Sequence, residues 1–228
     1  MKVVLTGPTG FIGREVLDQC YQHPSVTSIV ALTRRQLPPH VSENAKVETV
    51  LVDNFLFYSP AVMHAIGGAD ACIWCLGKAW MNDSDTAKTV HVDFTMMAAK
   101  ALTNQTIDDS GNTRRLRFVY LSGGLAERDQ EKPLWFQQDY RRIRGQVENV
   151  LHDHFQNNPN TFEPYIIRPG FVVAKERSVR NTIRSWGPSV RVDNLAKAML
   201  MIALDGCEEN TLGNRAILAQ ATRADSSS

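Results

Sequence analysis

The chain opens with an apolar segment, residues 2–6, that runs directly into a glycine-rich turn and then an amphipathic stretch. Gly7, Gly10 and Gly13 are spaced three residues apart in this turn. The first glycine of such a turn permits a sharp bend off a strand, the second lets a ligand approach the backbone, and the third allows the following helix to pack closely on the sheet. The pattern therefore predicts a strand, a turn that binds a diphosphate, and a helix whose first amides face that diphosphate. The predicted contacts are Gly7, Thr9, Gly10, Phe11, Ile12 and Gly13.

Apolar segments alternate with amphipathic stretches along the rest of the chain, which is typical of a doubly wound parallel sheet. We expect strands over residues 2–6, 28–33, 46–52, 71–76, 117–122 and 164–170, with a short last strand over 216–218. We expect helices over 11–21, 60–66, 87–103, 135–157 and 193–204. The predicted fold class is α/β: a single-domain Rossmann fold over 1–223, with helices on both faces of the sheet and a disordered tail over 224–228.

Two segments interrupt the alternation, at about 78–85 and 174–190. Both follow the carboxyl ends of predicted strands, where ligands bind in open α/β sheets, so we expect them to form a small substrate cap. Residues 177–191 contain four arginines. Two readings stay open for this stretch: a solvated flap, or recognition of an anionic substrate.

Charge and length limit the classes of partner. The 228 residues suit one well-buried domain, and 25 Lys and Arg against 24 Asp and Glu leave a net charge of +1. That balance gives no field to attract nucleic acid or an anionic membrane, and apolar runs such as 198–204 fall far short of the roughly 20 residues that span a bilayer. A predicted strand at residue 2 leaves no room for a signal peptide, and four cysteines are too few for a disulfide scaffold. We expect a cytoplasmic monomer or homodimer that binds a small molecule.

Two candidate metal motifs have simpler explanations. Cys72 and Cys75 form a CxxC motif, but it lies in a predicted buried strand and no second pair completes a zinc site. His152 and His154 lie near the end of a polar helix, where a solvated face accounts for them. We therefore predict no metal site.

A glycine turn of this kind holds the diphosphate of a nicotinamide dinucleotide, and the end of the second predicted strand distinguishes NAD from NADP. An Asp or Glu there accepts hydrogen bonds from the ribose of NAD. This chain has Thr33, Arg34 and Arg35 instead, so no carboxylate repels a 2′-phosphate and two guanidiniums can bind it with forked hydrogen bonds. NADP(H) is favoured over NAD(H), and the alternative is that both arginines only face water.

Other strand ends provide further candidate contacts. Asp53 follows the third strand and is placed to meet the adenine edge, while Leu76 and Gly77 end the fourth strand beneath the adenosine ribose. Lys78 follows in the next loop and faces either a cofactor phosphate or solvent.

Several motifs in order resemble the short-chain dehydrogenase/reductase superfamily, in its extended and atypical branches. The likeness covers nearly the whole chain and is greatest for the small oxidoreductases similar to the Tat-interacting protein. The motifs are TGPTGFIG at 6–13, CLGK at 75–78, VHVDF at 90–94, VYLSGG at 119–124, YRRIRGQVE at 140–148, IIRPGFVV at 166–173 and VRVDNLAKAML at 190–200.

The resemblance implies hydride chemistry by a Tyr, a Lys four residues later, and a Ser or Thr after the fifth strand. The matching positions are Tyr140, Arg144 in place of the lysine, and Ser122, with Gly123 as the alternative for the hydroxyl position. An arginine stays charged beside the tyrosine but cannot relay a proton at neutral pH. The resemblance also implies that Tyr140 and Arg144 contact the cofactor, with residue 144 at the nicotinamide ribose, and that the backbone at Pro169 lies against the nicotinamide.

These motifs predict an NADP(H)-dependent oxidoreductase that acts on a small carbonyl or alcohol, with secondary metabolism as one setting. The altered residues Arg144 and Ser122 keep two alternatives open: an NADP(H)-dependent redox sensor, and a non-redox isomerase, dehydratase or cyclase on the same fold. Sugar-nucleotide epimerisation is disfavoured because little chain follows the sixth strand to build a substrate lobe.

Overall fold

A computed structural model of the chain describes residues 1–77, 83–105, 114–175 and 188–226. Its main sheet is parallel throughout, in the order β3-β2-β1-β4-β5-β6-β9. The strands are β1 (Lys2–Thr6), β2 (Ser28–Thr33), β3 (Val47–Leu51), β4 (Ala71–Trp74), β5 (Leu116–Leu121), β6 (Phe162–Arg168) and β9 (Thr211–Gly213). The strand order reverses between β1 and β4, so the carboxyl ends of these two strands form the crevice in which such sheets bind ligands.

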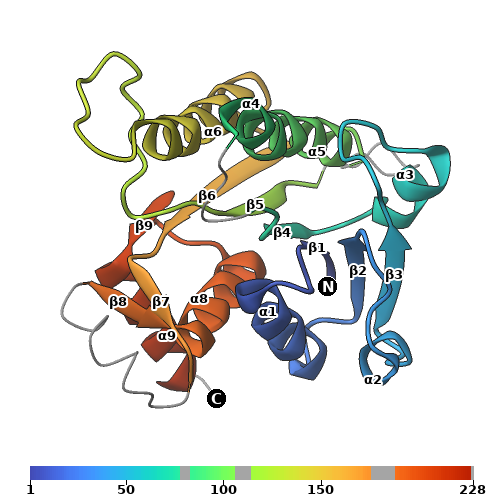
Figure 1. Cartoon of the computed structure of the whole chain (residues 1–228). Coiled ribbons are helices and arrows are strands. Elements are labelled where there is room, and N and C mark those ends of the chain that lie inside the picture. Colours follow the sequence, from blue (N-terminus) through green and yellow to red (C-terminus); the bar gives the residue numbers. More distant parts are fainter. Residues whose placement is uncertain (78–82, 106–113, 176–187, 227–228) are drawn as a thin grey trace.

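Helices cover both faces of the sheet (Figure 1). One layer contains α3 (Pro60–Ile66), α4 (Ser84–Lys88), the π-helical turn η1 (Thr89–Asp93), α5 (Phe94–Thr103) and α6 (Gln138–Asn157). The other layer contains α1 (Phe11–Gln22), α8 (Val192–Asp205) and α9 (Asn214–Ser226), and the short α2 (Pro39–Ser42) follows β2. A second small sheet pairs β7 (Phe171–Val173) with β8 (Ser189–Arg191).

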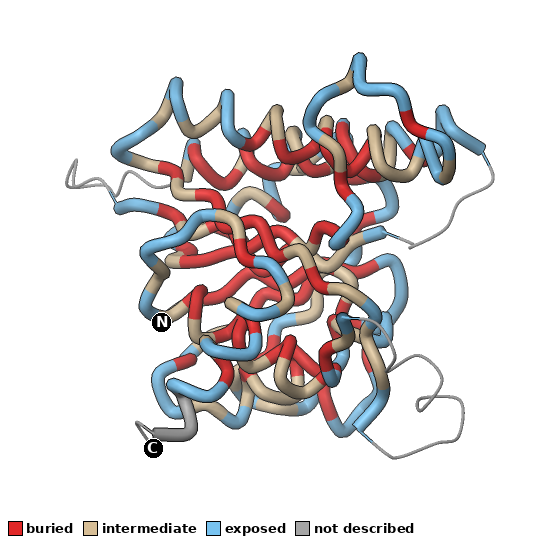
Figure 2. Tube along the Cα trace, turned by 90° about the vertical axis from the view of Figure 1, so that its left-hand side faces the viewer, coloured by how far each residue is buried: buried red, intermediate tan, exposed pale blue. Residues whose placement is uncertain are grey.

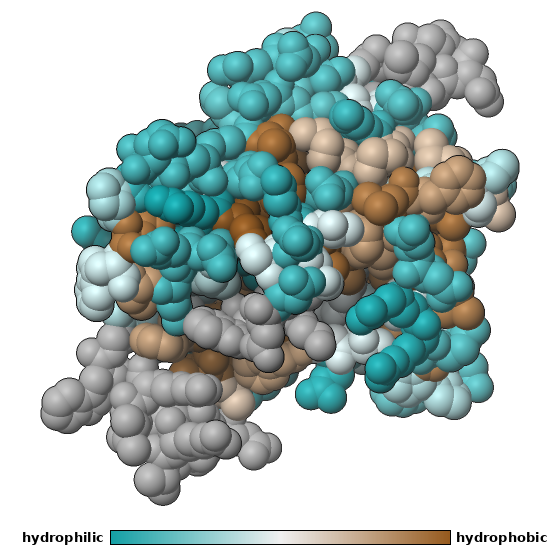
Figure 3. Space-filling model, turned by 45° about the horizontal axis from the view of Figure 1, so that its top comes forward, coloured by the Kyte–Doolittle hydropathy of each residue, from teal (hydrophilic) through white to brown (hydrophobic). Residues whose placement is uncertain are grey.

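The core consists of two apolar clusters, one on each face of the sheet. Successive strand residues point to opposite faces, so Val3 and Leu5 of β1 pack in one cluster while Val4 packs in the other. Figure 2 shows the buried residues concentrated in the middle of the molecule. Seen from the α4–α6 side, the surface is hydrophilic over much of its area, with apolar residues gathered toward its middle and right (Figure 3).

The predicted α/β fold class is confirmed, and most predicted elements occur within a few residues of their expected bounds. The helix expected over 87–103 is divided by the π-helical turn η1. The strand expected over 216–218 is wrong: this segment is helical in α9, because Ile217 and Ala221, four residues apart, face the core, and the last strand is β9.

The predicted tail and the two predicted substrate-cap segments lie only partly within the described residues. The tail expected over 224–228 includes the last turn of α9, which ends at Ser226, while residues 227–228 lie outside the described residues. Most of the two expected cap segments, at 78–82 and 176–187, also lies outside the described residues. Their described remainders include the start of α4 and the strand β8.

Candidate nucleotide-binding and catalytic site

The glycine-rich turn lies at the carboxyl end of β1, in close contact with the end of β4. Gly7 has φ +68°, and a Cβ added to it would lie 2.6 Å from the carbonyl oxygen of Cys75. A Cβ on Gly13 would lie 2.1 Å from the carbonyl oxygen of Gly7. A Cβ on Gly10 would meet only that same oxygen, at 3.3 Å. Gly7 and Gly13 therefore allow the turn to pack closely, and Gly10 leaves the outward side of the turn free of a side chain.

The amino end of α1 is available to an anion. The backbone N–H of Gly10 donates to the Gly7 carbonyl oxygen at 3.0 Å, and Gly10 then provides no side-chain cap for the helix. No acidic residue occupies the first turn of α1, so the helix itself places no carboxylate beside its dipole and its first amides. Thr9 and Phe11 are exposed beside them, and Ile12 is half-buried. These residues fit the diphosphate of a dinucleotide.

The end of β2 directs two guanidiniums outward. Thr33 is buried, and its hydroxyl donates to the carbonyl oxygen of Arg35 at 3.0 Å while accepting from the backbone N–H of Arg35 at 3.3 Å. This local turn leaves Arg34 and Arg35 exposed, and within the described part of the chain no carboxylate forms an ion pair with either. Because β2 adjoins β1, both arginines lie at the edge of the sheet that carries the glycine turn.

The ends of β3 and β4 hold the remaining nucleotide candidates. Asp53 is exposed after β3, and Leu76 is half-buried after β4. Gly77 has φ +131°, and a Cβ there would lie 2.4 Å from Cε1 of His91, so this position requires glycine. Lys78 lies outside the described residues.

Tyr140 and Arg144 lie on one face of α6, one turn apart. The guanidinium carbon of Arg144 is 5.6 Å from the centre of the Tyr140 ring, a cation–π arrangement. Nη1 of Arg144 donates to the Tyr120 hydroxyl at 3.1 Å and to the Leu121 carbonyl oxygen at 2.9 Å, which fixes the guanidinium against β5. Burial lowers the pKa of Arg144, but interactions with Tyr120, Tyr140 and Glu148 raise the pKa above its ordinary value. The site thus contains a permanent buried positive charge beneath Tyr140.

Ser122 and Gly123 point in different directions. The Ser122 hydroxyl is buried and donates to Oε1 of Glu148 at 2.6 Å. A Cβ added to Gly123 would instead lie 2.3 Å from the hydroxyl oxygen of Tyr140. Ser122 lies on the same side of β5 as Tyr120, toward α6, whereas Gly123 follows at the end of the strand. Of the two positions that sequence reasoning left open, Gly123 is the one that faces Tyr140.

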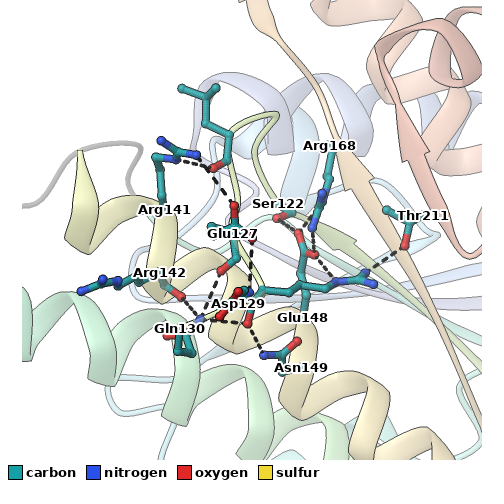
Figure 4. Close-up of polar contacts among 12 residues, drawn as sticks. Ser122, Glu127, Asp129, Gln130, Arg141, Arg142, Glu148, Asn149, Arg168 and Thr211 are labelled. Carbon is teal, nitrogen blue, oxygen red and sulfur yellow. Dashed lines mark hydrogen bonds and ion pairs between the residues drawn. The ribbon is translucent and has the colours of Figure 1, made fainter. Parts of the chain in front are cut away.

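Sequence reasoning missed the role of Glu148, which is fully buried and central to a polar network (Figure 4). Besides Ser122, it accepts hydrogen bonds from Nε of Arg128 at 2.7 Å, Nε of Arg168 at 2.9 Å and Nη2 of Arg168. Its position four residues after Arg144, on the same helical face, was the available signal.

Pro169 lies beside this network, and its carbonyl oxygen accepts from the backbone N–H of Gly124 at 2.8 Å. The ends of β5 and β6 are therefore in direct backbone contact next to Tyr140. The described nucleotide contacts predicted after β1, β2, β3, β4 and β6 lie at the same carboxyl edge of the sheet as the catalytic positions predicted after β5 and on α6.

The two motifs considered as metal ligands, Cys72 with Cys75 and His152 with His154, are placed differently with respect to solvent. Cys72 is buried and Cys75 partly buried, both as free thiols, and burial raises the pKa of each. His152 is exposed as expected, but the expectation of a solvated His154 is wrong: it is half-buried, with Nε2 2.9 Å from the Thr103 hydroxyl and its ring edge-on to Phe162. Among the described residues there is no group of three or more His, Cys, Asp and Glu placed to hold a metal, and no helix long and apolar enough to cross a membrane.

Comparison with known proteins gives structural matches only. No family model matches the sequence, and a search of curated proteins found no significant match. Gre2 from Candida albicans in complex with NADPH superposes with a TM-score of 0.71 at 18% identity, over 93% of this chain and 77% of that one. Yeast methylglyoxal/isovaleraldehyde reductase Gre2 with NADPH gives 0.69 at 15% identity, over 93% and 77%.

UDP-glucuronic acid 4-epimerase from Bacillus cereus with NAD gives a TM-score of 0.68 at 14% identity, over 93% of this chain and 76% of that one. The chain therefore has the same fold as these NADPH- and NAD-bound proteins, a Rossmann fold, as its motifs predicted. Because reductases and an epimerase share this fold, the choice among activities has to come from the site itself.

Proposed function

We propose that the chain binds NADP(H) and interconverts a small carbonyl compound and the corresponding alcohol. The observation that carries the proposal is the placement of Tyr140, whose hydroxyl lies against Gly123 and whose ring lies over the Arg144 guanidinium. This acid–base group stands at the same sheet edge as a glycine turn and helix terminus that fit a dinucleotide diphosphate.

The bound nucleotide would supply or accept the hydride. In the direction of reduction, Tyr140 donates a hydrogen bond to the substrate oxygen and gives up its proton as the alcohol forms. The fixed charge of Arg144 stabilises the resulting tyrosinate, because it lies in a buried site where water does not screen it. Since a guanidinium keeps its proton at neutral pH, Tyr140 has to regain its proton from another donor.

The preference for NADP(H) over NAD(H) rests on Arg34 and Arg35. Both are exposed after β2 with no carboxylate partner in the described structure, which suits a 2′-phosphate. The other predicted nucleotide contacts, at Asp53, Leu76, Gly77, Lys78 and Pro169, remain proposals. A cytoplasmic location and a monomeric or homodimeric state are likewise proposed.

Tyr140→Phe tests the catalytic proposal. We expect the purified protein to bind NADPH and to oxidise it with members of a panel of aldehydes and ketones. The variant should bind NADPH as tightly as the wild type, while its kcat falls about 100-fold or more, since it lacks the proton donor. Equal kcat values for the two proteins on a true substrate would rule out Tyr140 as the acid.

A second function, an NADP(H)-dependent sensor without turnover, is favoured by two observations: Gly123 provides no hydroxyl to polarise a carbonyl, and Arg144 cannot relay protons. Tight NADPH binding without oxidation across the same panel would favour the sensor. A non-redox reaction would instead convert its substrate with no net change in the absorbance of NADPH.

A further inference from the structure

We propose that Glu148 is a positioning residue that holds the ends of β5 and β6 against α6, in the position required by the nicotinamide half of the nucleotide. This inference rests on the proposed function, because a nucleotide that reacts beside Tyr140 has to place its nicotinamide next to Gly123. Glu148 has no exposed surface, yet its carboxylate receives four hydrogen bonds from three side chains of distant segments.

Two of those side chains belong to the residues that come directly before Gly123 and Pro169, the backbone positions predicted to lie beside the reacting end of the nucleotide. Ser122, the residue before Gly123, donates to Oε1 of Glu148 at 2.6 Å. Arg168, the residue before Pro169, donates from Nε to the same oxygen at 2.9 Å and from Nη2 to Oε2. One carboxylate of α6 therefore binds the residue that follows β5 and the last residue of β6 at once (Figure 4).

The contact between the two strand ends leaves little tolerance. The backbone N–H of Gly124 donates to the carbonyl oxygen of Pro169 at 2.8 Å, and a Cβ on Gly124 would lie 2.9 Å from that oxygen. The strands approach here through backbone alone, with no side chain between them. Backbone hydrogen bonds set the separation of the two strands, up to the one from Ser122 N–H to the Ile167 carbonyl oxygen at 2.8 Å. The side chains of Ser122 and Arg168 are both bound by Glu148 from the α6 side, which holds the two strand ends in place relative to α6 and Tyr140.

Charge explains why a neutral replacement is not equivalent. Arg128 and Arg168 both form ion pairs with Glu148, and the Arg128 guanidinium continues to the Thr211 hydroxyl of β9 at 3.0 Å. Loss of the buried carboxylate leaves two guanidiniums facing each other without a counter-charge. A glutamine has the same shape, but its NH₂ group can only donate, so it cannot accept from arginine at both ends of the side chain.

The adenosine half has separate supports. The diphosphate turn follows β1, and Arg34 and Arg35 follow β2, whereas the strand ends bound by Glu148 lie beyond β4 in the sheet. A change at Glu148 is therefore expected to act on the nicotinamide half of NADPH while the adenosine half keeps its contacts.

Calorimetric titration of Glu148→Gln with two ligands tests this division. The ligands are NADPH and adenosine 2′,5′-bisphosphate, which lacks the nicotinamide. We expect the Kd of NADPH to rise about tenfold and that of the bisphosphate to stay within about twofold. The matched control is Glu127→Gln: Glu127 pairs with Lys132 at 2.7 Å and lies in the same β5–α6 connection, so both of its Kd values should match the wild type.

The decisive quantity is the Kd of NADPH divided by the Kd of the bisphosphate. If this ratio is the same for wild type and Glu148→Gln, the inference is overturned, even if the variant melts at a lower temperature, because a purely structural role affects both ligands alike. Wild-type binding of both ligands without carbonyl reduction would reject the reductase activity alone, since the titration needs no turnover. Wild-type failure to bind either ligand would reject both. If Glu148→Gln does not fold, Ser122→Ala keeps both ion pairs and should raise only the Kd of NADPH, about threefold; an unchanged value would overturn the inference.

Discussion

Gly123→Ala is the most direct test of the proposed arrangement around Tyr140. The added Cβ would lie 2.3 Å from the Tyr140 hydroxyl oxygen and 3.3 Å from Cζ. Because non-bonded carbon atoms pack at about 3.5 Å and oxygen slightly closer, the hydroxyl has to move by about 1 Å. Arg144 cannot follow it, since its guanidinium is fixed to Tyr120 and to the backbone of Leu121.

A displacement of about 1 Å at a reacting group typically costs about 100-fold in rate, or about 2.7 kcal/mol of barrier. We therefore expect kcat for carbonyl reduction to fall about 100-fold while the Kd of NADPH changes less than about threefold. Gly123→Ser should lose activity as well, despite its new hydroxyl, because it carries the same Cβ.

Gly213→Ala is the matched control for a glycine-to-alanine change. Gly213 has nothing within 4 Å of an added Cβ, and its φ is not in the left-handed region. Stopped-flow oxidation of NADPH with a saturating substrate would compare the wild type, Gly123→Ala and Gly213→Ala. A kcat for Gly123→Ala within about twofold of the Gly213→Ala value would refute the placement of Tyr140 against residue 123.

Three further predictions concern binding and stability. Arg34→Ala and Arg35→Ala should each weaken NADPH binding about tenfold, through loss of charge-assisted hydrogen bonds, and leave NADH binding unchanged in fluorescence titrations; equal effects on both nucleotides would contradict the 2′-phosphate assignment. Gly145→Ala should lower the free energy of unfolding in urea by about 3 kcal/mol or more, because its Cβ would lie 1.6 Å from the Glu127 carbonyl oxygen; a wild-type midpoint would contradict this contact. Burial lowers the pKa of His154, so the unfolded chain binds its proton more readily; stability should decrease as pH falls through about 6.5, and His154→Gln should show a shallower decrease, whereas parallel curves would exclude this contribution.

The fold was predictable because its signals are local. An apolar strand, a glycine turn with fixed spacing and an amphipathic helix each follow from neighbouring residues, and their repetition fixes a parallel sheet. The errors lie where tertiary contacts outweigh local pattern. Residues 216–218 resemble a strand in isolation, but the packing of Ile217 and Ala221 against the core makes the segment helical.

The site was harder to predict because its chemistry depends on one residue of register. Ser122 and Gly123 are adjacent, and only the three-dimensional structure shows that the serine hydroxyl turns to Glu148 while the glycine faces Tyr140. A motif can locate the end of β5 but cannot show where each side chain points, because the strand's alternation ends there.

The same change of register connects the two unusual features of the site. A serine at position 123 would bring a Cβ that overlaps the present position of the Tyr140 hydroxyl. The glycine and the close approach of the tyrosine therefore require each other. The serine at 122 instead completes the hydrogen bonding of a carboxylate that also binds two arginines. Arg144, held one turn before that carboxylate, adds a charge that no described carboxylate pairs with directly. A site built in this way places the Tyr140 hydroxyl by backbone proximity and fixed charge. The reaction rate should therefore depend more on the absence of a side chain at residue 123 than on the presence of a hydroxyl at 122.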